Sequence, residues 1–314
     1  MSREKISIVV PCYNEEESLP IFYEEICNVA SKMKKLDFEF LFINDGSKDK
    51  TLSLLREFSK KDKRVRYISF SRNFGKEAGM YAGLSNVTGD YVAIMDADMQ
   101  DPPSMIIDMY ESIIEEGYDC CALYSSRHDD YTFLRKFFTN CWYKLIGAIS
   151  SVPQMPGARD YRLMKRKMVD AIVDMGEYNR YTKGIFSFVG FNTKWIDYVP
   201  PGRVAGKSKF NFIKLFKYAL EGILAFSTTP LVISAVIGII FCLVAFLAII
   251  VIIAKTLAFG DPVGGWPSLA CMIMFMGGIQ LFFFGVMGMY LSKIYLEVKK
   301  RPIYISKETE KDIN

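Results

Sequence analysis

The chain has 314 residues, 51% of them hydrophobic, so it is long enough and apolar enough to bury a sizeable core. Lys and Arg number 39 against 35 Asp and Glu, and a net charge of +4 in so mixed a pattern disfavours nucleic acid as a partner. With one histidine, His128, a Ser-His-Asp triad and zinc sites built on several histidines are nearly excluded. The seven cysteines are odd in number and lack C-x-x-C spacing, which favours reduced thiols.

Predicted strands and helices alternate through the first two thirds of the chain. Short apolar runs that end near turn-forming or charged residues predict strands at 6–10, 38–43, 65–70, 91–95 and 119–123. Helical patterns lie between them at 18–34, 51–60, 76–85 and 103–116. This alternation predicts an α/β domain with a mostly parallel sheet, in which ligands bind beyond the carboxyl ends of the strands.

The segments that follow the first two predicted strands are polar. Residues 11–17 lack the Gly-x-Gly-x-x-Gly pattern, which disfavours a plain NAD-binding Rossmann domain. Residues 206–208 resemble the end of a phosphate-binding P-loop, but the required earlier glycine is missing. Asp45 lies in the turn after the second strand, where its carboxylate either accepts hydrogen bonds from a nucleoside or caps the next helix.

The most informative cluster follows the fourth predicted strand and contains Asp96, Asp98 and Gln100. Alternate residues of an extended chain face the same way, so we expect these three side chains to converge. Their hard oxygen donors suit Mg²⁺ or Mn²⁺, with water and diphosphate oxygens filling the remaining positions. The alternative is a solvated acidic turn ahead of a helix, for which the Asp-Pro-Pro of residues 101–103 is natural punctuation.

Two long apolar runs in the last third of the chain predict transmembrane helices at 231–254 and 268–292. Each covers about 35 Å, more than the hydrocarbon core of a bilayer. The alternative is a pair of buried helices in a soluble core. Lysines precede the first run and follow the second, so the positive-inside rule places the predicted α/β domain and both termini in the cytoplasm. Apolar residues at helical spacing within 206–228 predict an amphipathic helix at the membrane surface.

The combination of these segments resembles a known family. Residues 10–17, 44–49, 73–79, 96–103, 160–163 and 203–209, followed by two spans, resemble the membrane-anchored family 2 glycosyltransferases of the GT-A fold. That family includes dolichyl-phosphate mannose synthases and bacterial undecaprenyl-phosphate glucosyltransferases. The resemblance implies a GT-A domain over 1–205, an amphipathic juxtamembrane segment over 206–228, two transmembrane helices within 229–293 and a cytoplasmic tail over 294–314.

The resemblance also implies roles for individual residues. Nucleotide binding is assigned to Pro11, Tyr13, Asn14, Glu15, Asp45, Lys76, Asp96, Arg203, Ser208 and Lys209. The metal is assigned to Asp96, Asp98 and Gln100, and catalysis to Asp160, Asp98 and Arg162. The phosphate of a lipid acceptor is assigned to Arg127, Arg135 and Thr139, with a basic helix start facing anionic headgroups as the alternative for the two arginines. Lys183-Gly184 and Phe188 stand where relatives often have Arg-Gly and Trp, which leaves sugar recognition open.

The function implied is transfer of a monosaccharide from a nucleotide sugar, UDP-linked by preference, to a polyprenyl phosphate such as undecaprenyl phosphate. The reaction is expected to depend on Mg²⁺ or Mn²⁺, to invert the anomeric configuration, and to supply a lipid-linked sugar for cell-envelope glycans. A phosphomonoester is already mostly dianionic at neutral pH, so Asp160 is expected to orient the acceptor, contact a sugar hydroxyl or act as a base. The alternatives are a processive polysaccharide synthase and a catalytically decayed sensor or scaffold. A second copy of the chain and a flippase of the same pathway are further candidate partners.

Overall fold

The computed structural model describes residues 3–125, 155–198, 227, 229–259 and 265–312. Some predicted features lie outside these residues, namely Arg127, Arg135, Thr139, Arg203, Ser208, Lys209 and the segment 206–228 apart from Ser227. The strands are β1 Lys5–Cys12, β2 Asp37–Asn44, β3 Val65–Phe70, β4 Tyr91–Ile94, β5 Cys120–Tyr124, β6 Ala158–Lys165, β7 Thr193–Asp197 and β8 Ser306–Thr309. The α-helices are α1 Leu19–Lys32, α2 Thr51–Lys61, α3 Lys76–Asn86, α4 Ile106–Glu116, α6 Arg166–Asp174, α7 Thr182–Phe188, α9 Thr229–Phe259 and α10 Trp266–Val298. Short 3-10 helices occupy Pro103–Met105 and Glu310–Asp312.

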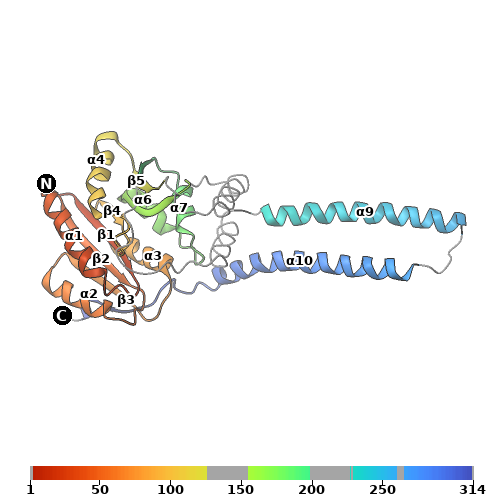
Figure 1. Ribbon diagram of the computed structural model, residues 1–314, viewed down its shortest axis with the longest axis horizontal. Helices are drawn as coiled ribbons and strands as arrows, with labels where there is room; N and C mark the ends of the chain where they lie inside the picture. Colours follow the sequence, from red (N-terminus) through yellow and green to blue (C-terminus); the bar gives the residue numbers. More distant parts are fainter. Residues whose placement is uncertain (1–2, 126–154, 199–226, 228, 260–264, 313–314) are drawn as a thin grey trace.

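The strands form one sheet in the order β7-β5-β6-β4-β1-β2-β3-β8 (Figure 1). Neighbouring strands are parallel in the pairs β1–β2, β1–β4, β2–β3 and β5–β7. They are antiparallel in the pairs β4–β6, β5–β6 and β3–β8. The prediction of a mostly parallel α/β sheet is confirmed, because helices α1, α2 and α3 link the successive parallel strands β1 to β4 as crossovers require.

The sheet is buried on both faces, which explains why its strands read as continuous apolar runs. In β1, Ile6, Ile8 and Val10 pack into one hydrophobic cluster with side chains of α1, α2 and α4. Val9 faces the other way and packs with side chains of α3, α6 and α7. All four of these β1 side chains are fully buried. The period of two along the strand therefore divides the core into two layers.

Helix α3 lies close against β1 because its buried face carries glycine. A Cβ placed on Gly83 would stand 2.0 Å from Cγ1 of Val9. A Cβ placed on Gly79, one turn earlier, would stand 3.4 Å from Cβ of Pro11. This close approach fixes the first residue of α3, Lys76, over the carboxyl end of β1.

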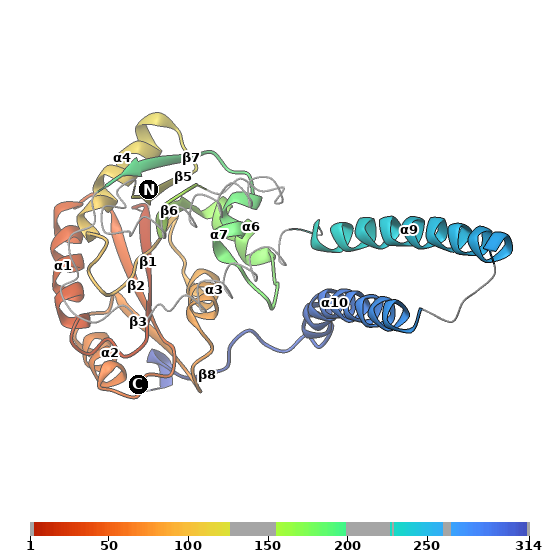
Figure 2. The same ribbon diagram turned by 45° about the vertical axis from the view of Figure 1, so that its right-hand side comes forward.

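Helices α9 and α10 contact one another and project from the α/β domain (Figures 1 and 2). Within the described residues, one segment, Phe275–Val298 of α10, is long and apolar enough to cross a membrane, and Thr229–Gly238 is a shorter apolar stretch at the start of α9. Only 6% of the Phe275–Val298 window is buried, and the side chain of Leu281 is 73% exposed. The alternative of a buried core helix is therefore wrong for this segment, whereas the second span stays a prediction.

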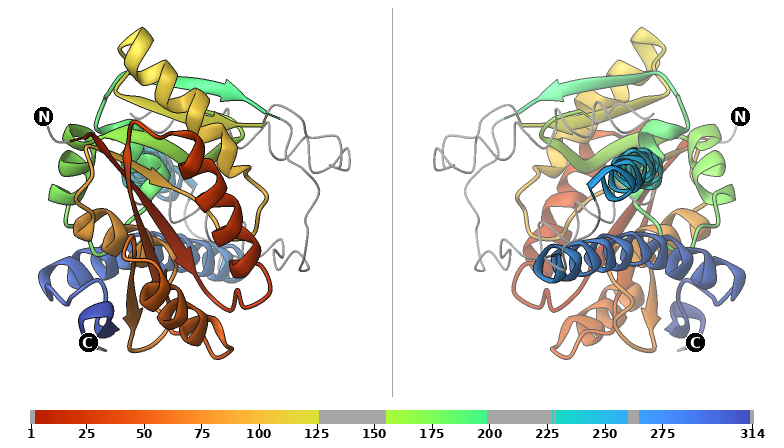
Figure 3. Two further views of the ribbon diagram at one scale, coloured as in Figure 1. Left: turned by 90° about the vertical axis from the view of Figure 1, so that its left-hand side faces the viewer. Right: turned by 90° about the vertical axis from the view of Figure 1, so that its right-hand side faces the viewer.

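The C-terminal segment returns to the domain, and the C-terminus lies at its edge (Figures 1 and 3). There β8 pairs antiparallel with β3, with Thr309 opposite Ile68. The ring of Tyr304 stacks on Phe70 at 4.9 Å between centroids. Part of the predicted tail over 294–314 thus completes the sheet, a role that its polar sequence did not suggest.

Candidate active site

The strand register brings together two carboxylates that are far apart in the sequence. Ile94, the last residue of β4, pairs with Arg162 of the antiparallel strand β6. Two residues beyond Ile94 is Asp96, and two residues before Arg162 is Asp160, so the two carboxylates lie at the same end of the sheet. Lys76 lies between them, and its Nζ donates to Oδ2 of Asp96 at 2.8 Å and to Oδ2 of Asp160 at 2.6 Å.

The protein environment sets the charges of these three groups. Burial alone would raise the pKa of Asp160, but Lys76, Lys183 and Arg162 attract its negative charge and lower the pKa. The pKa of Asp96 is raised, first by burial and then by the negative charges nearby, although Lys76 opposes this. Burial disfavours the Lys76 ammonium, but the two carboxylates outweigh burial and raise its pKa. The side chains of Asp96 and Asp160 remain 31% and 17% exposed, so this charged cluster is open to a ligand.

The expected alternation of Asp96, Asp98 and Gln100 along an extended chain is wrong. Strand β4 ends at Ile94, and residues 97–100 form a turn in which Met99 has a φ of 59°. Oδ1 of Asp98 accepts a hydrogen bond from the backbone N–H of Gln100 at 3.1 Å. The acidic turn that we considered as the alternative is thus present, and it still places Asp98 close enough to Asp96 to raise its pKa.

No group of three His, Cys, Asp or Glu side chains in the described part of the chain is arranged to hold a metal ion. The donor set nevertheless fits a hard divalent cation, because Asp96 and Asp98 supply carboxylate oxygens and Gln100 supplies an amide oxygen. Asp98 and Asp160 both raise the pKa of Asp96, a repulsion that a bound cation would relieve. The metal role of these residues stays a prediction.

Asp101 is a site residue that the sequence reasoning treated as punctuation. It is 4% exposed, and Oδ1 accepts a hydrogen bond from the Tyr198 hydroxyl. Burial raises its pKa to about 6, although Arg159, whose Nε lies 3.9 Å from Oδ1, opposes the shift. Its proximity to Tyr198 and Arg159 depends on strands distant in sequence, so no local pattern predicts it.

The loops after β1 and β2 are joined by hydrogen bonds at the same edge of the sheet. The N–H of Asn14 donates to Oγ of Ser47 at 3.0 Å, and Oδ1 of Asn14 accepts from the N–H of Lys48 at 2.9 Å. The N–H of Glu15 donates to Oγ1 of Thr51 at 2.9 Å. Asn14 has a φ of 55°, a left-handed conformation that asparagine tolerates. These bonds fix the predicted nucleotide-binding loop, which also holds the 39% exposed Tyr13 and follows Pro11.

Asp45 caps a helix, but it is a more distant helix than the sequence suggested. Its carboxylate accepts backbone hydrogen bonds from Phe74 at 2.6 Å and Gly75 at 2.9 Å, at the start of α3. Asp45 is 4% exposed, and burial raises its pKa against these two hydrogen bonds. The carboxylate thereby helps to position Lys76, the next residue, while its nucleoside contact stays a prediction.

Arg162 is buried and contacts other parts of the protein. It is 3% exposed, its guanidinium lies 3.5 Å from the ring centroid of Phe186, and one N–H donates to the carbonyl of Arg159 at 3.0 Å. Its charge contributes to the low pKa of Asp160. The catalytic role predicted for Arg162 stays a prediction, and these contacts favour an influence through Asp160.

Polar loops and carboxylates gather beyond the carboxyl ends of parallel strands, the place where ligands bind in open α/β sheets. Residues 7–173 match the model of the family described as Glycosyl transferase family 2. The chain is 44% identical over 308 residues to the SfII prophage-derived bactoprenol glucosyl transferase of Shigella flexneri, covering 98% of this chain and 99% of that relative. It is equally similar, at 44% over 308 residues, to the prophage bactoprenol glucosyl transferase homolog of Escherichia coli K12, covering 98% of this chain and 100% of the relative.

Among solved structures, the mannosyltransferase PcManGT from Pyrobaculum calidifontis, in complex with GDP-Man and Mn²⁺, is similar with a TM-score of 0.44 and 15% identity, covering 94% of this chain and 86% of that one. The family match and the full-length relatives show that the chain belongs to glycosyl transferase family 2 and is a glycosyltransferase.

Proposed function

We propose that this glycosyltransferase moves a monosaccharide from a nucleotide sugar, with UDP as the favoured nucleotide, to the phosphate of a polyprenyl carrier such as undecaprenyl phosphate. The single observation that carries the proposal is the convergence of Asp96, Asp160 and Lys76 at the carboxyl end of the sheet. The names of the full-length relatives, bactoprenol glucosyl transferases, support a polyprenyl acceptor. The apolar segment Phe275–Val298 supports a reaction at a membrane, and we place it at the cytoplasmic face of the cell membrane.

The departing nucleotide gains negative charge on its diphosphate. Asp96, Asp98 and Gln100 would hold Mg²⁺ or Mn²⁺, which when bound offsets that charge. Within the described residues, Lys76 holds Asp96 and Asp160 at fixed positions through its two hydrogen bonds. The loop with Asn14 and Glu15, fastened to the segment after β2, would present the nucleotide to this cluster.

The acceptor phosphate does not require a strong base. The second pKa of a phosphomonoester is about 6, so the group is mostly dianionic at neutral pH. Asp160 is a poor base, because its pKa is lowered by Lys76 and Lys183 and a good general base has a pKa near the working pH. We therefore assign Asp160 to orienting a sugar hydroxyl or the acceptor. Direct attack of the phosphate on the anomeric carbon would invert its configuration.

The test is sugar transfer by the purified full-length protein in detergent, with undecaprenyl phosphate and a panel of radiolabelled nucleotide sugars. Thin-layer chromatography of the lipid fraction should show one labelled lipid monosaccharide, lost after chelation and restored by Mg²⁺ or Mn²⁺. Asp98→Asn and Asp160→Asn should each lower turnover about a hundredfold or more. Asp108→Asn, on the exposed face of α4, is the matched control and should retain turnover. A labelled polymer would favour the processive alternative, and no lipid product with any donor would overturn the proposal.

A further inference from the structure

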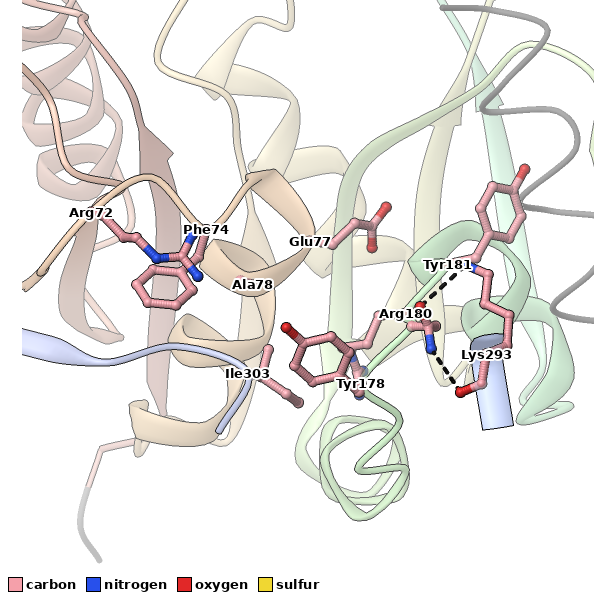
Figure 4. A pocket seen from close by; sticks show the side chains of 10 residues that line it. Arg72, Phe74, Glu77, Ala78, Tyr178, Arg180, Tyr181, Lys293 and Ile303 are labelled. Carbon is pink, nitrogen blue, oxygen red and sulfur yellow. Dashed lines mark hydrogen bonds between the residues drawn. The ribbon is translucent and has the colours of Figure 1, made fainter. Parts of the chain in front are cut away.

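A cavity of about 350 Å³ lies where the α/β domain meets the C-terminal end of α10 (Figure 4). Figure 4 shows Arg72 and Phe74 on one side and Tyr181 and Lys293 on the other, with Tyr178 between them. The cavity is further lined by Glu77, Ala78, Asn179, Arg180 and Ile303. Its size falls within the range of roughly 300–1,000 Å³ typical of small-molecule sites.

Three cations and one carboxylate line this cavity. Arg72, Arg180 and Lys293 line it, and none of them forms an ion pair with a residue that the structure describes. Lys293 donates to Oδ1 of Asn179 at 3.2 Å, and Arg72 donates to the carbonyl of Asn73 at 2.9 Å. The lining therefore carries more positive than negative charge, although the Glu297 carboxylate lies beside it and accepts from the N–H groups of Tyr178 and Asn179.

The one carboxylate in the lining is already engaged. Oε2 of Glu77 accepts hydrogen bonds from the N–H and the hydroxyl of Thr182. Glu77 also attracts the Arg180 guanidinium, without forming a close ion pair with it.

Arg180 is the independent sign of a missing partner. Arg180 is 8% exposed, and two of its guanidinium nitrogens donate to the carbonyls of Met175 and Ile172. Its guanidinium lies 4.5 Å from the ring centroid of Tyr81. Among the described residues, its Nε is the buried side-chain nitrogen or oxygen that has no hydrogen-bond partner. A buried charged donor left without a partner is costly, so an anion close to this guanidinium would be stabilised.

The cavity is placed at the level of lipid headgroups if α10 spans the membrane. Lys293 follows Trp266, at the start of the helix, by about 40 Å at 1.5 Å per residue. The hydrocarbon core is about 30 Å thick and the bilayer with its headgroups about 40–45 Å. Lys293 then lies in the headgroup layer on the side of the α/β domain, where aromatic residues such as Tyr178 and Tyr181 are favoured.

We propose that this cavity binds the phosphate group of an anionic membrane phospholipid, through Arg72, Arg180 and Lys293. The lining of this cavity does not include Asp96, Asp160 or Lys76, although Glu77 directly follows Lys76. Lipid bound there would join α10 to the 178–181 segment and to α3, whose first residue is Lys76. Only the placement of α10 is shared with the proposed function, and the test below measures binding without sugar transfer.

The test is isothermal titration calorimetry of the full-length protein in neutral detergent with dihexanoyl phosphatidic acid, dihexanoyl phosphatidylcholine and inorganic phosphate. Phosphatidic acid should bind saturably, and phosphatidylcholine at least about tenfold more weakly. Lys293→Gln and Arg72→Gln should each weaken binding of phosphatidic acid about tenfold, the loss expected for one charge-assisted hydrogen bond. Lys299→Gln, just beyond the end of α10 and outside the cavity, removes the same charge and should leave the affinity within about twofold.

The outcomes distinguish a lipid phosphate from free phosphate, and both from the absence of an anion site. Inorganic phosphate that binds as tightly as phosphatidic acid, with the same sensitivity to Lys293→Gln, would show an anion site but overturn its assignment to a lipid. Equal weakening by Lys299→Gln, or no saturable binding of either anion to protein with an unchanged thermal midpoint, would overturn the site itself. A protein that binds phosphatidic acid as expected but transfers no sugar would refute the proposed function alone.

Discussion

At the scale of residues, Lys76 is the centre of the site. Its ammonium joins a carboxylate from the end of β4 to one from the start of β6. The sequence resemblance assigned Lys76 to the nucleotide, whereas the structure adds its contact with Asp96 and Asp160. Asp101 was missed, because its partners are distant in sequence: Arg159 lies in β6, and Tyr198 follows the end of β7.

Removing the ammonium should disable the site. We expect Lys76→Met to lower the turnover of sugar transfer about a hundredfold, because Asp96 and Asp160 would repel one another and lose their fixed positions. Lys76→Arg should retain more turnover than Lys76→Met, since it keeps the charge. The measurement is the initial rate at saturating donor and acceptor. Lys63→Met, at an exposed surface lysine, is the control, and an equally small effect of both Met variants would contradict the role of Lys76.

At the scale of elements, α3 depends on glycine for its position. We expect Gly83→Ala to lower the free energy of unfolding by about 1–3 kcal/mol, because the added methyl group would overlap the buried Val9 side chain. Gly176→Ala is the matched control, since a Cβ there has no neighbour within 4 Å. Thermal or urea unfolding of the full chain in detergent measures the difference. Equal midpoints for the two variants would show that α3 can move away from β1 at no cost.

Strand β8 is held to the sheet by charge as well as by backbone pairing. Arg56 donates to Glu308, and the Tyr67 hydroxyl donates to the same carboxylate at 2.6 Å. The Arg56 guanidinium, followed by the Tyr67 hydrogen bond, lowers the pKa of Glu308 to about 2. The ordinary pKa of glutamate is about 4.3. This stabilisation is therefore fully present above that value and is lost as the pH falls towards 2.

The pH dependence gives a direct prediction for β8. At neutral pH, Glu308→Gln should destabilise the pairing of β8 by about 1 kcal/mol, a value kept small because the Arg56 side chain is 43% exposed. The difference from the unmodified protein should shrink as the pH is lowered from about 4 to 2, because protonated Glu308 no longer attracts Arg56. Amide hydrogen exchange across β8, compared between the proteins at each pH, measures this. Glu57→Gln, an exposed carboxylate paired with Lys61, should show no such change in β8.

At the scale of the whole molecule, the chain leaves the α/β domain through α9, returns through α10 and rejoins the sheet as β8. The N–H groups of Tyr178 and Asn179 donate to the Glu297 carboxylate near the end of α10. The domain is thus attached to α10 at two places, the 178–179 segment and the β8 edge. This double attachment would hold the active site at a fixed orientation to the membrane.

Both ends of the chain should lie on the cytoplasmic side, with the connection between α9 and α10 outside. Alkaline phosphatase fused after Gly265 should be active, since the enzyme folds only after export, whereas a fusion after Asp312 should be inactive. Green fluorescent protein at the same two positions should give the opposite pattern. Inactive phosphatase at both positions would contradict two crossings and favour a helical hairpin that stays on one side.

The sequence alone determined the alternating strands and helices, their mostly parallel sheet and the identity of the polar segments at its carboxyl edge. A strand that is buried on both faces of a sheet needs a continuous run of apolar residues, and turns need particular residues, so both can be recognised in the sequence. The tertiary structure decided which polar groups meet: the register of β4 and β6 placed Asp160 beside Asp96, and the packing of α3 placed Lys76 between them. It also decided that residues 306–309 form an edge strand, because antiparallel pairing with β3 depends on where α10 returns the chain and leaves little trace in a short polar sequence.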